Sequence, residues 1–430
     1  MRIVRHSDPD FATQMAALAA PSSLFDPVIE ERTAAILKTV REQGDAALLE
    51  LTAKFDGAQL TLEQLPVTAA ELMNSSLRAD ASLRAAVKDA HRNIANFARR
   101  SLRRGWQARN SHGALVGEKF DPFQRVGIYI PGGTAPLVST ALMTVTLAQV
   151  AGCPEIVVCT PPGKDGSINP ALLFAARMAG ATEIYRVGGS QAIAALGYGT
   201  PTIRRVQKIF GPGNAYVVAA KRLLFGHVAV DLLPGPSEVC VLADDSANPV
   251  FIAADLLAQA EHGSGHERVW VITTSGKLTK AIAREVERQL PSLTRREFIE
   301  KILADNAWII QVKDLKAGIA LANQLAPEHC ELMVKQARKV SAQILTAGAI
   351  FLGNDSPTVL GDYVAGPSHT LPTGGAGASF AGLTVDQFQR RTSVVEYRKP
   401  GVRKALKSVQ KFAALEGLDA HGRSAEIRLA

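Results

Sequence analysis

The spacing of apolar residues changes about a quarter of the way along the chain. Up to about residue 110, apolar positions recur three or four residues apart among strong helix formers, which predicts helices within 27–56 and 83–102. From Val126 onward, short apolar runs that end in Gly or Pro alternate with helical stretches. This alternation is typical of a parallel, doubly wound α/β sheet.

Two such alternating runs are present, so the sequence predicts two α/β units. The first run places strands at 125–133, 155–162 and 183–189 and helices at 139–152, 169–180 and 190–199. The second run places strands at 238–244, 268–274 and 307–312 and helices at 249–262 and 277–290. After about Leu383 the sequence loses strand character and ends in a helix at 402–417.

Composition favours a globular protein: of 430 residues, 47% are hydrophobic and 20% are charged. No apolar run reaches the roughly 18 residues of a membrane span, and charges stand where a signal peptide has its apolar core. We therefore expect a cytoplasmic protein with no membrane partner. The four cysteines form no CxxC pair, which favours buried, reduced thiols over a cysteine-based zinc site.

The net charge of +8 does not by itself indicate a nucleic-acid partner. The densest basic run, "RRSLRR" at 99–104, has no aromatic residues between its arginines. A solvated helix face is the favoured interpretation, and no nucleic acid is expected as a partner. Attraction of a phosphorylated cofactor is the second interpretation.

The window "APEHCEL" at 326–332 brings four chemically active residues together. His329 and its carboxylate neighbours have the composition of a metal site. His329 beside Cys330 has the composition of an activated thiol nucleophile. Glu328 with His329 has the composition of an acid–base pair. The residues of the window alone leave all three interpretations open.

No standard nucleotide-binding motif is present. The sequence has no GxGxxG and no Walker string, and "GGAGAS" at 374–379 follows no strand. Three glycine-containing strand ends remain as candidates for binding an anion: "YIPGGTAPL", "VGGSQAIA" and "GPGNAYV". Each precedes a helix, where free backbone N–H groups and the helix dipole favour negative charge. Ordinary turn glycines are the competing interpretation.

The segment "ADLLAQAEHGSGHE" is a candidate metal-binding helix. Gln259 and His262 lie three residues apart on one helix face, with Asp255 a turn earlier. The alternative is that His262 only caps the end of the helix before a glycine. His266, in the loop that follows, is expected to be solvated.

Further candidates lie in two polar segments toward the end of the chain. Asp362 and His369 occur in "LGDYVAGPSHTLPT", among glycines and prolines that suggest ordered loops. Glu416 and His421 occur in "EGLDAHGRS", where a frayed tail would leave them inert.

Together these segments resemble one family. "YIPGGTAPL", "GPGNAYV", "GPSEV", "DLLAQAEH", "NQLAPEHCEL", "GDYVAGPSHTLPT", "SVVEY" and "EGLDAHGRS" match histidinol dehydrogenases in order, from about residue 25 to the end. Members of that family oxidise L-histidinol to L-histidine in two NAD-linked steps through a bound aldehyde. This is the last step of histidine biosynthesis, and each subunit carries one zinc ion.

The resemblance implies a role for individual residues of this chain. The zinc ligands correspond to Gln259, His262, Asp362 and His421. The acid–base pair corresponds to Glu328 and His329. The substrate-binding set corresponds to Ser237, Glu238, His369 and Glu416, together with His329 and the four zinc ligands. The NAD contacts correspond to Tyr129, Gln191 and Asn214.

The resemblance also implies an architecture. We expect two Rossmann-like α/β domains without GxGxxG, plus a helical N-terminal arm and a C-terminal tail, in an intertwined homodimer with shared active sites. The expected boundaries are an arm at 1–25, a first domain at 26–128 with 236–382, a second domain at 129–235 that carries the NAD loops, and a tail at 383–430 that reaches the partner. In such a dimer His421 would not be frayed.

Two departures from the family and three competing functions remain. Pro234 stands where the family more often has Ala, and "EHGSGHERV" is an unusual loop. One alternative keeps the fold and changes the substrate to another polyol or a hydroxy-sulfonate. A second uses Cys330 as the nucleophile, but strand alternation places Cys330 on an apolar face opposite His329 and Glu331 toward solvent. A third is a metal- or nucleotide-binding protein with an inactive site.

Overall fold

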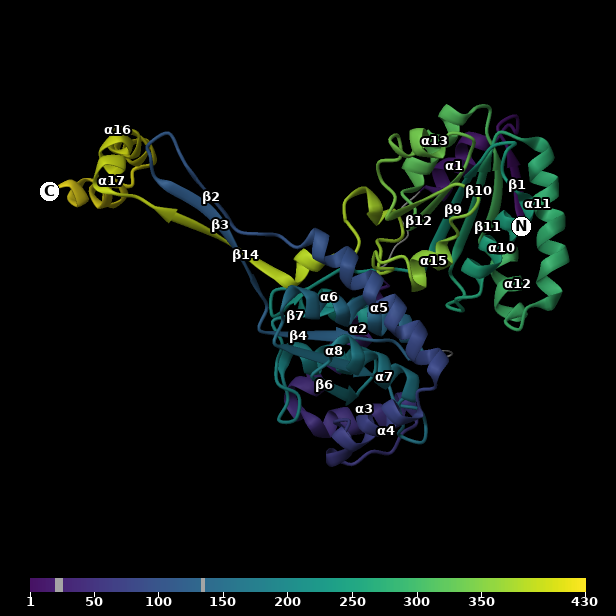
Figure 1. The fold of residues 1–430 in the computed structure, drawn as a ribbon, viewed down its shortest axis with the longest axis horizontal. Helices are drawn as coiled ribbons and strands as arrows, with labels where there is room; N and C mark the ends of the chain where they lie inside the picture. The colour runs from purple at the N-terminus through teal and green to yellow at the C-terminus, as the bar shows by residue number, and fades with distance from the viewer. Residues whose placement is uncertain (20–25, 133–135) are drawn as a thin grey trace.

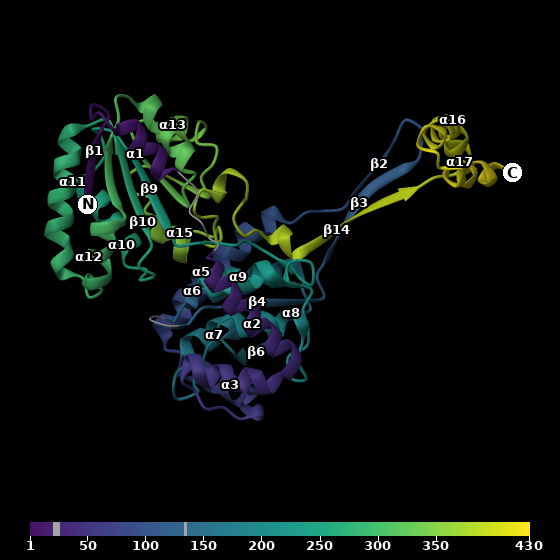
Figure 2. The same cartoon turned by 180° about the vertical axis from the view of Figure 1, so that it is seen from behind.

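A computed structural model describes residues 1–19, 26–132 and 136–430. Two α/β units lie side by side, and a long arm extends away from both of them (Figures 1 and 2). In those three ranges no helix combines the length and the apolar character needed to cross a bilayer.

The six-stranded unit surrounds a parallel sheet with the strand order β1-β11-β10-β9-β12-β13. Its elements are β1 (Arg2–Arg5), α1 (Phe11–Leu18), β9 (Glu238–Ala243), α10 (Pro249–Ala260), β10 (Arg268–Thr273), α11 (Gly276–Gln289), α12 (Arg296–Asp305), β11 (Ala307–Gln311), α13 (Leu315–Leu325), β12 (His329–Met333), α14 (Ala337–Ser341), β13 (Ala349–Leu352) and α15 (Thr358–Tyr363). From β9 the chain adds strands first on one side and then on the other, which is a doubly wound order.

The five-stranded unit repeats this plan with the strand order β6-β5-β4-β7-β8, again all parallel. Its elements are α2 (Pro27–Gln43), α3 (Asp45–Asp56), α4 (Ala69–Arg78), α5 (Ala81–Ser101), β4 (Arg125–Tyr129), α6 (Val138–Ala151), β5 (Glu155–Thr160), α7 (Pro170–Ala179), β6 (Glu183–Arg186), α8 (Gly189–Tyr198), β7 (Lys208–Phe210), α9 (Ala215–Leu224) and β8 (Ala229–Val230). The predicted alternation of strands and helices is confirmed in both units.

Helices cover both faces of each sheet, which is why the strands are apolar throughout. In the five-stranded unit, Ile94 of α5 packs with α6 and α7 on one face. Leu37 of α2 and Leu48 of α3 pack with α8 and α9 on the other. In the six-stranded unit, α10, α11 and α12 cover one face and α1, α13 and α14 the other.

The arm is a three-stranded antiparallel sheet that carries two helices at its far end. It consists of β2 (Trp106–Arg109), β3 (Leu115–Pro122), β14 (Gln389–Glu396), α16 (Lys399–Glu416) and α17 (Asp419–Glu426). At its base, the buried ring of Phe388 stacks on Phe210 of β7 at 3.8 Å between centroids. This contact anchors the arm to the five-stranded unit.

The domain boundaries differ from those expected. Residues 26–128 were expected to share a domain with 236–382, but α2 to α5 pack on the five-stranded sheet instead. The apolar faces of these helices pack against the sheet formed by the strands that follow them in the chain. The expected second domain at 129–235 therefore lacks the helices that complete its core.

Both ends of the chain also contain strands that periodicity did not predict. Residues 1–25 were expected to form an arm, but β1 pairs in parallel with β11 at the edge of the six-stranded sheet. Residues 20–25 lie outside the described part. The tail after Leu383 was expected to be helical, yet β14 pairs with β3 over eight residues. Pairing with distant strands stabilises segments whose own pattern is weak.

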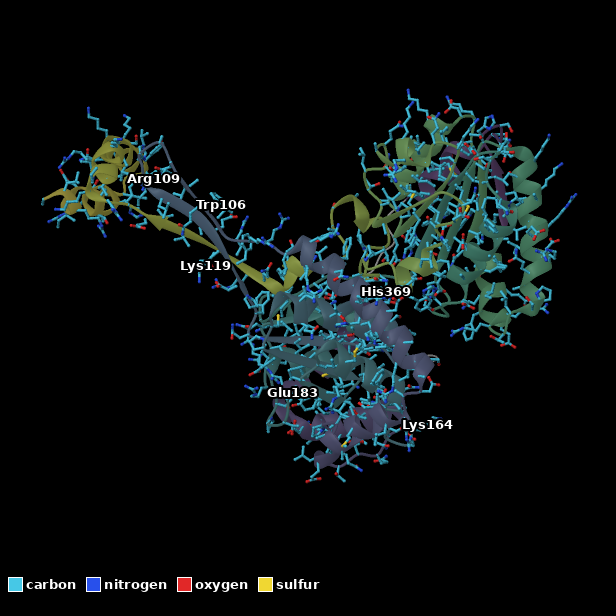
Figure 3. The ribbon with its side chains drawn as sticks, viewed as in Figure 1. Trp106, Arg109, Lys119, Lys164, Glu183 and His369 are labelled. Atoms are coloured by element: carbon cyan, nitrogen blue, oxygen red, sulfur yellow. The ribbon has the colours of Figure 1, made fainter. Side chains whose placement is uncertain are left out.

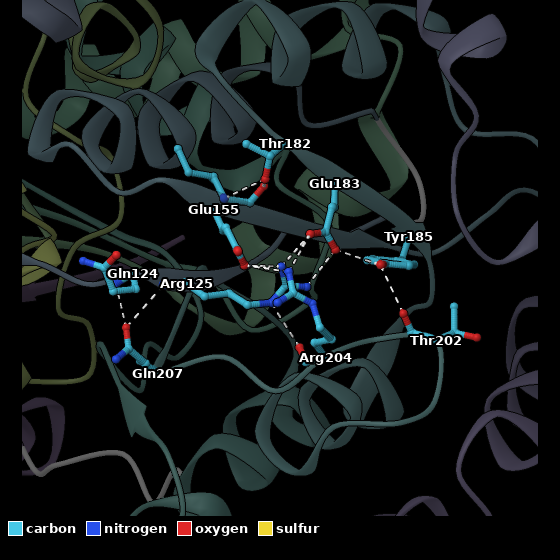
Figure 4. A network of polar contacts seen from close by, with 10 residues as sticks. Gln124, Arg125, Glu155, Thr182, Glu183, Tyr185, Thr202, Arg204 and Gln207 are labelled. Carbon is cyan, nitrogen blue, oxygen red and sulfur yellow. Dashed lines mark hydrogen bonds and ion pairs between the residues drawn. The ribbon is translucent and has the colours of Figure 1, made fainter.

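One buried arginine ties together the amino ends of three strands in the five-stranded sheet (Figure 4). The Arg125 guanidinium donates to Glu155 at 2.7 Å and to both carboxylate oxygens of Glu183 at 2.5 and 2.7 Å. The Arg125 hydrogen bond keeps the pKa of Glu183 below its usual value. Tyr185 donates to Glu183 as well, and Arg204 approaches Glu155 from the solvent side.

Replacing Arg125 should destabilise the protein far more than replacing Arg204. Arg125→Ala leaves two carboxylates without their buried partner and should lower the free energy of unfolding by about 3 kcal/mol. The side chain of Arg204 is 65% exposed, so Arg204→Ala should cost less than about 1 kcal/mol. Urea denaturation monitored by far-UV circular dichroism measures both variants, and equal losses would contradict this account.

Candidate functional site

The candidate site gathers at the amino ends of two adjacent inner strands, β9 and β12, of the six-stranded sheet. β9 begins at Glu238 and β12 begins at His329, and these strands are parallel neighbours. Ligands of doubly wound sheets usually lie beyond the carboxyl ends of the strands. In this protein the predicted NAD residues lie at the carboxyl ends of the five-stranded sheet, where Tyr129 ends β4 and Asn214 follows β7. The predicted residues therefore come from opposite edges of two different sheets.

The main chain of Glu238 holds both members of the predicted acid–base pair. Its N–H donates to Glu328 Oε2 at 2.8 Å, and its carbonyl oxygen accepts from His329 Nδ1 at 3.0 Å. The carbonyl can only accept, so Nδ1 carries the proton and Nε2 is the free basic nitrogen of the neutral ring. Burial raises the pKa of the Glu328 carboxyl, and the nearby Ser237 side chain opposes that rise.

Burial sets the protonation behaviour of this cluster. It raises the pKa of Glu328 well above its ordinary value, although the Glu238 N–H bond opposes the shift. Burial also raises the pKa of Glu238 to about 7 and lowers the pKa of His329. The His329 ring is therefore neutral at pH 7 and ready to accept a proton.

The other two chemically active residues of the window at 326–332, Cys330 and Glu331, do not belong to this acid–base pair. Cys330 is fully buried in the apolar cluster with Leu332 and Val334, on the face opposite His329, as predicted. Glu331 was expected to face solvent, and that prediction is wrong. Glu331 is 0% exposed and accepts the N–H of Thr358 at 2.9 Å. It lies on the same strand face as His329, two residues along, so the covering helices bury it too.

Three of the four predicted zinc ligands come from neighbouring elements. Gln259 ends the buried face of α10, His262 follows in the next turn, and Asp362 lies in the short helix α15 rather than in a loop. α10 packs against α15, and Asp362 Oδ1 lies 3.7 Å from His329 Nε2. His266, which was predicted to be solvated, is exposed.

The Gln259 amide and the His262 ring fit a cation at this place. Gln259 is 2% exposed, yet its amide nitrogen has no hydrogen-bond partner. Such an amide is costly unless an external group binds it, and turning it over presents its oxygen. His262 Nδ1 bonds the carbonyl of Gln259 at 3.0 Å, which is a helix-capping contact that leaves Nε2 free. The capping and ligand interpretations are therefore compatible.

His421 and Glu416 are not brought to these residues within one chain. Both side chains are exposed and lie on the two helices at the far end of the arm (Figures 1 and 2). Across the described ranges, no three His, Cys, Asp or Glu side chains gather closely enough to hold a metal ion. The single chain thus presents an incomplete ligand set of two such groups and one amide.

His369 lies where the two α/β units meet (Figure 3). Its Nδ1 bonds the carbonyl of Asp362 at 3.0 Å, and its Nε2 lies 3.1 Å from the hydroxyl of Thr140 on α6. A second contact between the units joins the Gly235 N–H to the Thr373 hydroxyl at 2.5 Å. Burial lowers the pKa of His369, so the ring is neutral at pH 7. Sequence reasoning missed Thr140, because nothing local marks it.

The predicted NAD residues gather at the carboxyl edge of the five-stranded sheet. The Tyr129 hydroxyl accepts the N–H of Gly189 at 3.1 Å, and Gln191 is buried two residues further along α8. Asn214 caps α9 by accepting two backbone N–H groups. Gly211 has a φ of +111°, and a Cβ there would lie 2.1 Å from the Tyr129 carbonyl oxygen, so only glycine fits.

A fully buried ion pair holds the loop before Asn214. Lys221 pairs with Asp231 and also donates to the carbonyls of Gly211 and Leu232 at 3.0 and 2.6 Å. Asp231 accepts the N–H of Gly211 at 2.8 Å. The pair fixes one predicted NAD loop and the start of the segment that leads to Ser237. In the "YIPGGTAPL" loop, residues 133–135 lie outside the described part.

The structure combines two parallel sheets, glycine loops at the carboxyl edge of one sheet and a buried Glu–His pair in the other unit. This combination is typical of nucleotide-dependent dehydrogenases. The sequence matches the family model for histidinol dehydrogenase over residues 22–429. It is 45% identical to histidinol dehydrogenases from Geobacillus kaustophilus, with 92% of each chain covered, and from Bacteroides fragilis, with 100% of this chain and 99% of the relative covered. The chain belongs to the histidinol dehydrogenase family.

A solved structure agrees with this assignment. The crystal structure of histidinol dehydrogenase from Elizabethkingia anophelis superposes with a TM-score of 0.94 at 36% identity. The match covers 100% of this chain and 98% of that one, so both α/β units and the arm belong to the shared fold.

Cys330→Ala should leave most of the histidinol-dependent NADH formation intact. The thiol packs in the core against Cys240 and is absent from the acid–base cluster. The small cavity should lower the free energy of unfolding by about 1 kcal/mol, measured by urea denaturation. Complete loss of turnover in a folded variant would instead restore the nucleophile interpretation.

Proposed function

We propose that this chain oxidises L-histidinol to L-histidine with two NAD, through a bound aldehyde, using zinc and the residues described above. The observation that carries the proposal is the orientation of His329. Its Nδ1 is tied to a main-chain carbonyl inside a buried site, and its free Nε2 faces Asp362. This geometry supports a general base beside a candidate zinc ligand.

His329 accepts a proton in the alcohol oxidation step. A hydride can leave the alcohol carbon only as the hydroxyl proton is taken up, and a neutral imidazole suits that role. Nε2 is the atom that takes the proton, because Nδ1 already carries one. The Glu238 carbonyl then stabilises the cationic ring, since it continues to accept from Nδ1–H.

Glu328 activates water in the second step, which converts the aldehyde to the acid. This step needs the oxygen of a water molecule to attack the aldehyde carbon. The ionised Glu328 carboxylate is a strong base, because burial raises its pKa. The Glu238 N–H holds the Oε2 atom of Glu328, so the orientation of this carboxylate is fixed before substrate binds.

Gln259, His262 and Asp362 would hold the zinc ion, together with His421 of a second subunit. The metal would bind and orient the substrate's amine and imidazole nitrogens. Ser237, Glu238 and His369 lie around the acid–base pair and would contact the same substrate, with Glu416 from the second subunit. The complete imidazole- and amine-binding set favours histidinol over another polyol or a hydroxy-sulfonate.

Tyr129, Gln191 and Asn214 would bind NAD, which supplies the hydride acceptor. Asn214 lies at the amino end of α9, where free N–H groups and the helix dipole favour a pyrophosphate. The site also lies between β4 and β7, where the strand order of the sheet reverses.

The arm supports a homodimer with shared active sites. Its apolar side chains Val395, Phe412, Leu415 and Ile427 are each more than half exposed in the single chain. An isolated arm of three strands and two helices buries little apolar surface of its own, and such exposed side chains mark an interface. A second subunit would cover them and receive His421 and Glu416.

The direct test is NADH formation from L-histidinol, measured with and without a chelator. Chelation should abolish most turnover, and added Zn²⁺ should restore it. A sulfonated diol and a simple polyol serve as competing substrates. Turnover with either of these but none with histidinol would overturn the proposed substrate, and zinc-loaded protein without any turnover would favour an inactive site.

Glu328→Gln should separate the two steps. Aldehyde oxidation should slow by roughly 10²- to 10⁴-fold, because only this step needs activated water, and alcohol oxidation should slow much less. Single-turnover rates with the alcohol and the aldehyde measure this difference. His329→Asn is the control that should impair both steps, and equal losses in Glu328→Gln would contradict the division of roles.

Mixed dimers test whether the arm completes a partner's site. His262→Ala and His421→Ala should each be inactive alone. In a dimer of one chain of each kind, one site carries both defects and the other carries none. Refolding an equal mixture should thus restore about a quarter of wild-type activity. If the mixture stays inactive while wild-type chains refolded in parallel recover activity, the ligand does not come from the partner.

A further inference from the structure

Glu331 occupies an unusual place for a carboxyl group. It lies inside the inner strand β12, is 0% exposed and takes no part in the acid–base roles described above. A buried carboxyl is costly unless it is hydrogen-bonded. Its contacts therefore show what it does for the fold.

Two neighbouring elements meet at this side chain. Glu331 Oε1 accepts the N–H of Thr358, the first residue of α15, at 2.9 Å. The Asp255 carboxyl, on α10 and 7% exposed, lies beside the Glu331 carboxyl, and the two buried groups interact. No N–H or O–H group in the described ranges reaches Glu331 Oε2, and a proton shared with the neighbouring Asp255 carboxyl would satisfy it. Glu331 thus joins one strand to two helices.

The pair holds this proton because of burial. Burial raises the pKa of Glu331 well above its ordinary value and raises that of Asp255 to about 6. A protonated Glu331 would donate to the Asp255 carboxylate, whereas two ionised carboxylates would repel each other at this position.

Asp255, Thr358 and Glu331 each lie one helical turn or one strand repeat away from a residue of the candidate site. Asp255 precedes Gln259 by four residues on the same face of α10. Thr358 precedes Asp362 by four residues in α15.

On the strand, Glu331 follows His329 by two residues and points to the same face of the sheet. A change at Glu331 therefore reaches the base as well as both helices that carry the predicted ligands.

We infer that Glu331, paired with Asp255, is a positioning residue of this site. It holds α10 and α15 at the separation at which Gln259 and Asp362 bind one zinc ion, and it aligns both with the base on β12. The inference rests on the proposed function, because it concerns the metal and the reaction assigned there.

Replacing Glu331 should weaken the site according to the hydrogen bonds that each variant keeps. Glu331→Gln still accepts from Thr358 and donates to Asp255, so its zinc affinity and kcat should stay within about threefold of wild type. Glu331→Leu keeps the volume but loses both bonds, and should lower zinc affinity and kcat by roughly 10- to 100-fold. The KM for NAD should not change, because the NAD loops lie in the other unit.

Zinc affinity is measured without substrate, by competition with a chromophoric chelator on the full-length protein. Leu332→Ala is the matched control: it is buried at the next position of β12 but points into the opposite core, so it should lose stability without losing zinc affinity. Thr358→Pro is the second probe if Glu331→Leu does not fold. It removes the N–H to Glu331, together with the threonine hydroxyl, at the first helical position, where proline is tolerated, and should lower zinc affinity by roughly fivefold.

The outcomes separate this inference from the proposed function. If wild type binds zinc and oxidises histidinol, and Glu331→Leu or Thr358→Pro does both equally well, the positioning role is overturned while the function stands. A wild-type protein that neither binds zinc nor oxidises histidinol overturns both. Loss in Leu332→Ala as large as in Glu331→Leu would show a general effect of destabilising β12, and would also overturn the positioning role.

Discussion

The arrangement of the candidate site depends on one main-chain contact, in which Glu238 holds both Glu328 and His329. The N–H and the carbonyl of the same residue point to the carboxylate and to the imidazole. This is possible because β9 and β12 are parallel neighbours whose amino ends stand level. Both side chains are buried, so no water competes for these bonds, and a shift of the strand register would leave two polar groups unpaired.

The position of this pair explains why two similar units can form one site. The five-stranded unit offers its carboxyl edge, where glycine loops leave room for a nucleotide. The six-stranded unit offers its amino edge, which doubly wound sheets seldom use. His369 bridges the two edges, with one nitrogen on the Asp362 carbonyl and the other beside Thr140. The Lys221–Asp231 pair fixes the segment that connects the units, so both edges are positioned by buried contacts.

The arm follows a different principle from the two units. Each α/β unit covers both faces of its sheet with its own helices, whereas the arm leaves large apolar side chains such as Phe412 and Leu415 exposed. Its helices also carry two polar residues, Glu416 and His421, that have no function where they stand in one chain. Exposed apolar side chains on such an element favour an assembly. In the proposed function a second subunit completes the site, because the predicted residues Glu416 and His421 lie on the arm.

Local patterns in the sequence predicted much of this protein. Apolar periodicity identified the alternating strands and helices of both units, because a helix face or a buried strand has a repeat that neighbouring residues carry themselves. The order of the motifs indicated the family. Strand alternation also placed Cys330 in the core, and this was confirmed. The same alternation puts Glu331 on the face of His329, but that face was expected to be solvated, because the pattern does not show which helices cover it.

Tertiary structure alone decided which unit each segment joins and how the site is held. α2 to α5 cover the five-stranded sheet although they were expected elsewhere, and β1 and β14 exist because distant strands pair with them. Thr140 and the main chain of Glu238 carry no local signal at all. The reason is physical: hydrophobic period and turn chemistry act between near neighbours in the chain, whereas sheet edges, buried carboxyl pairs and contacts between units form between residues up to hundreds of positions apart.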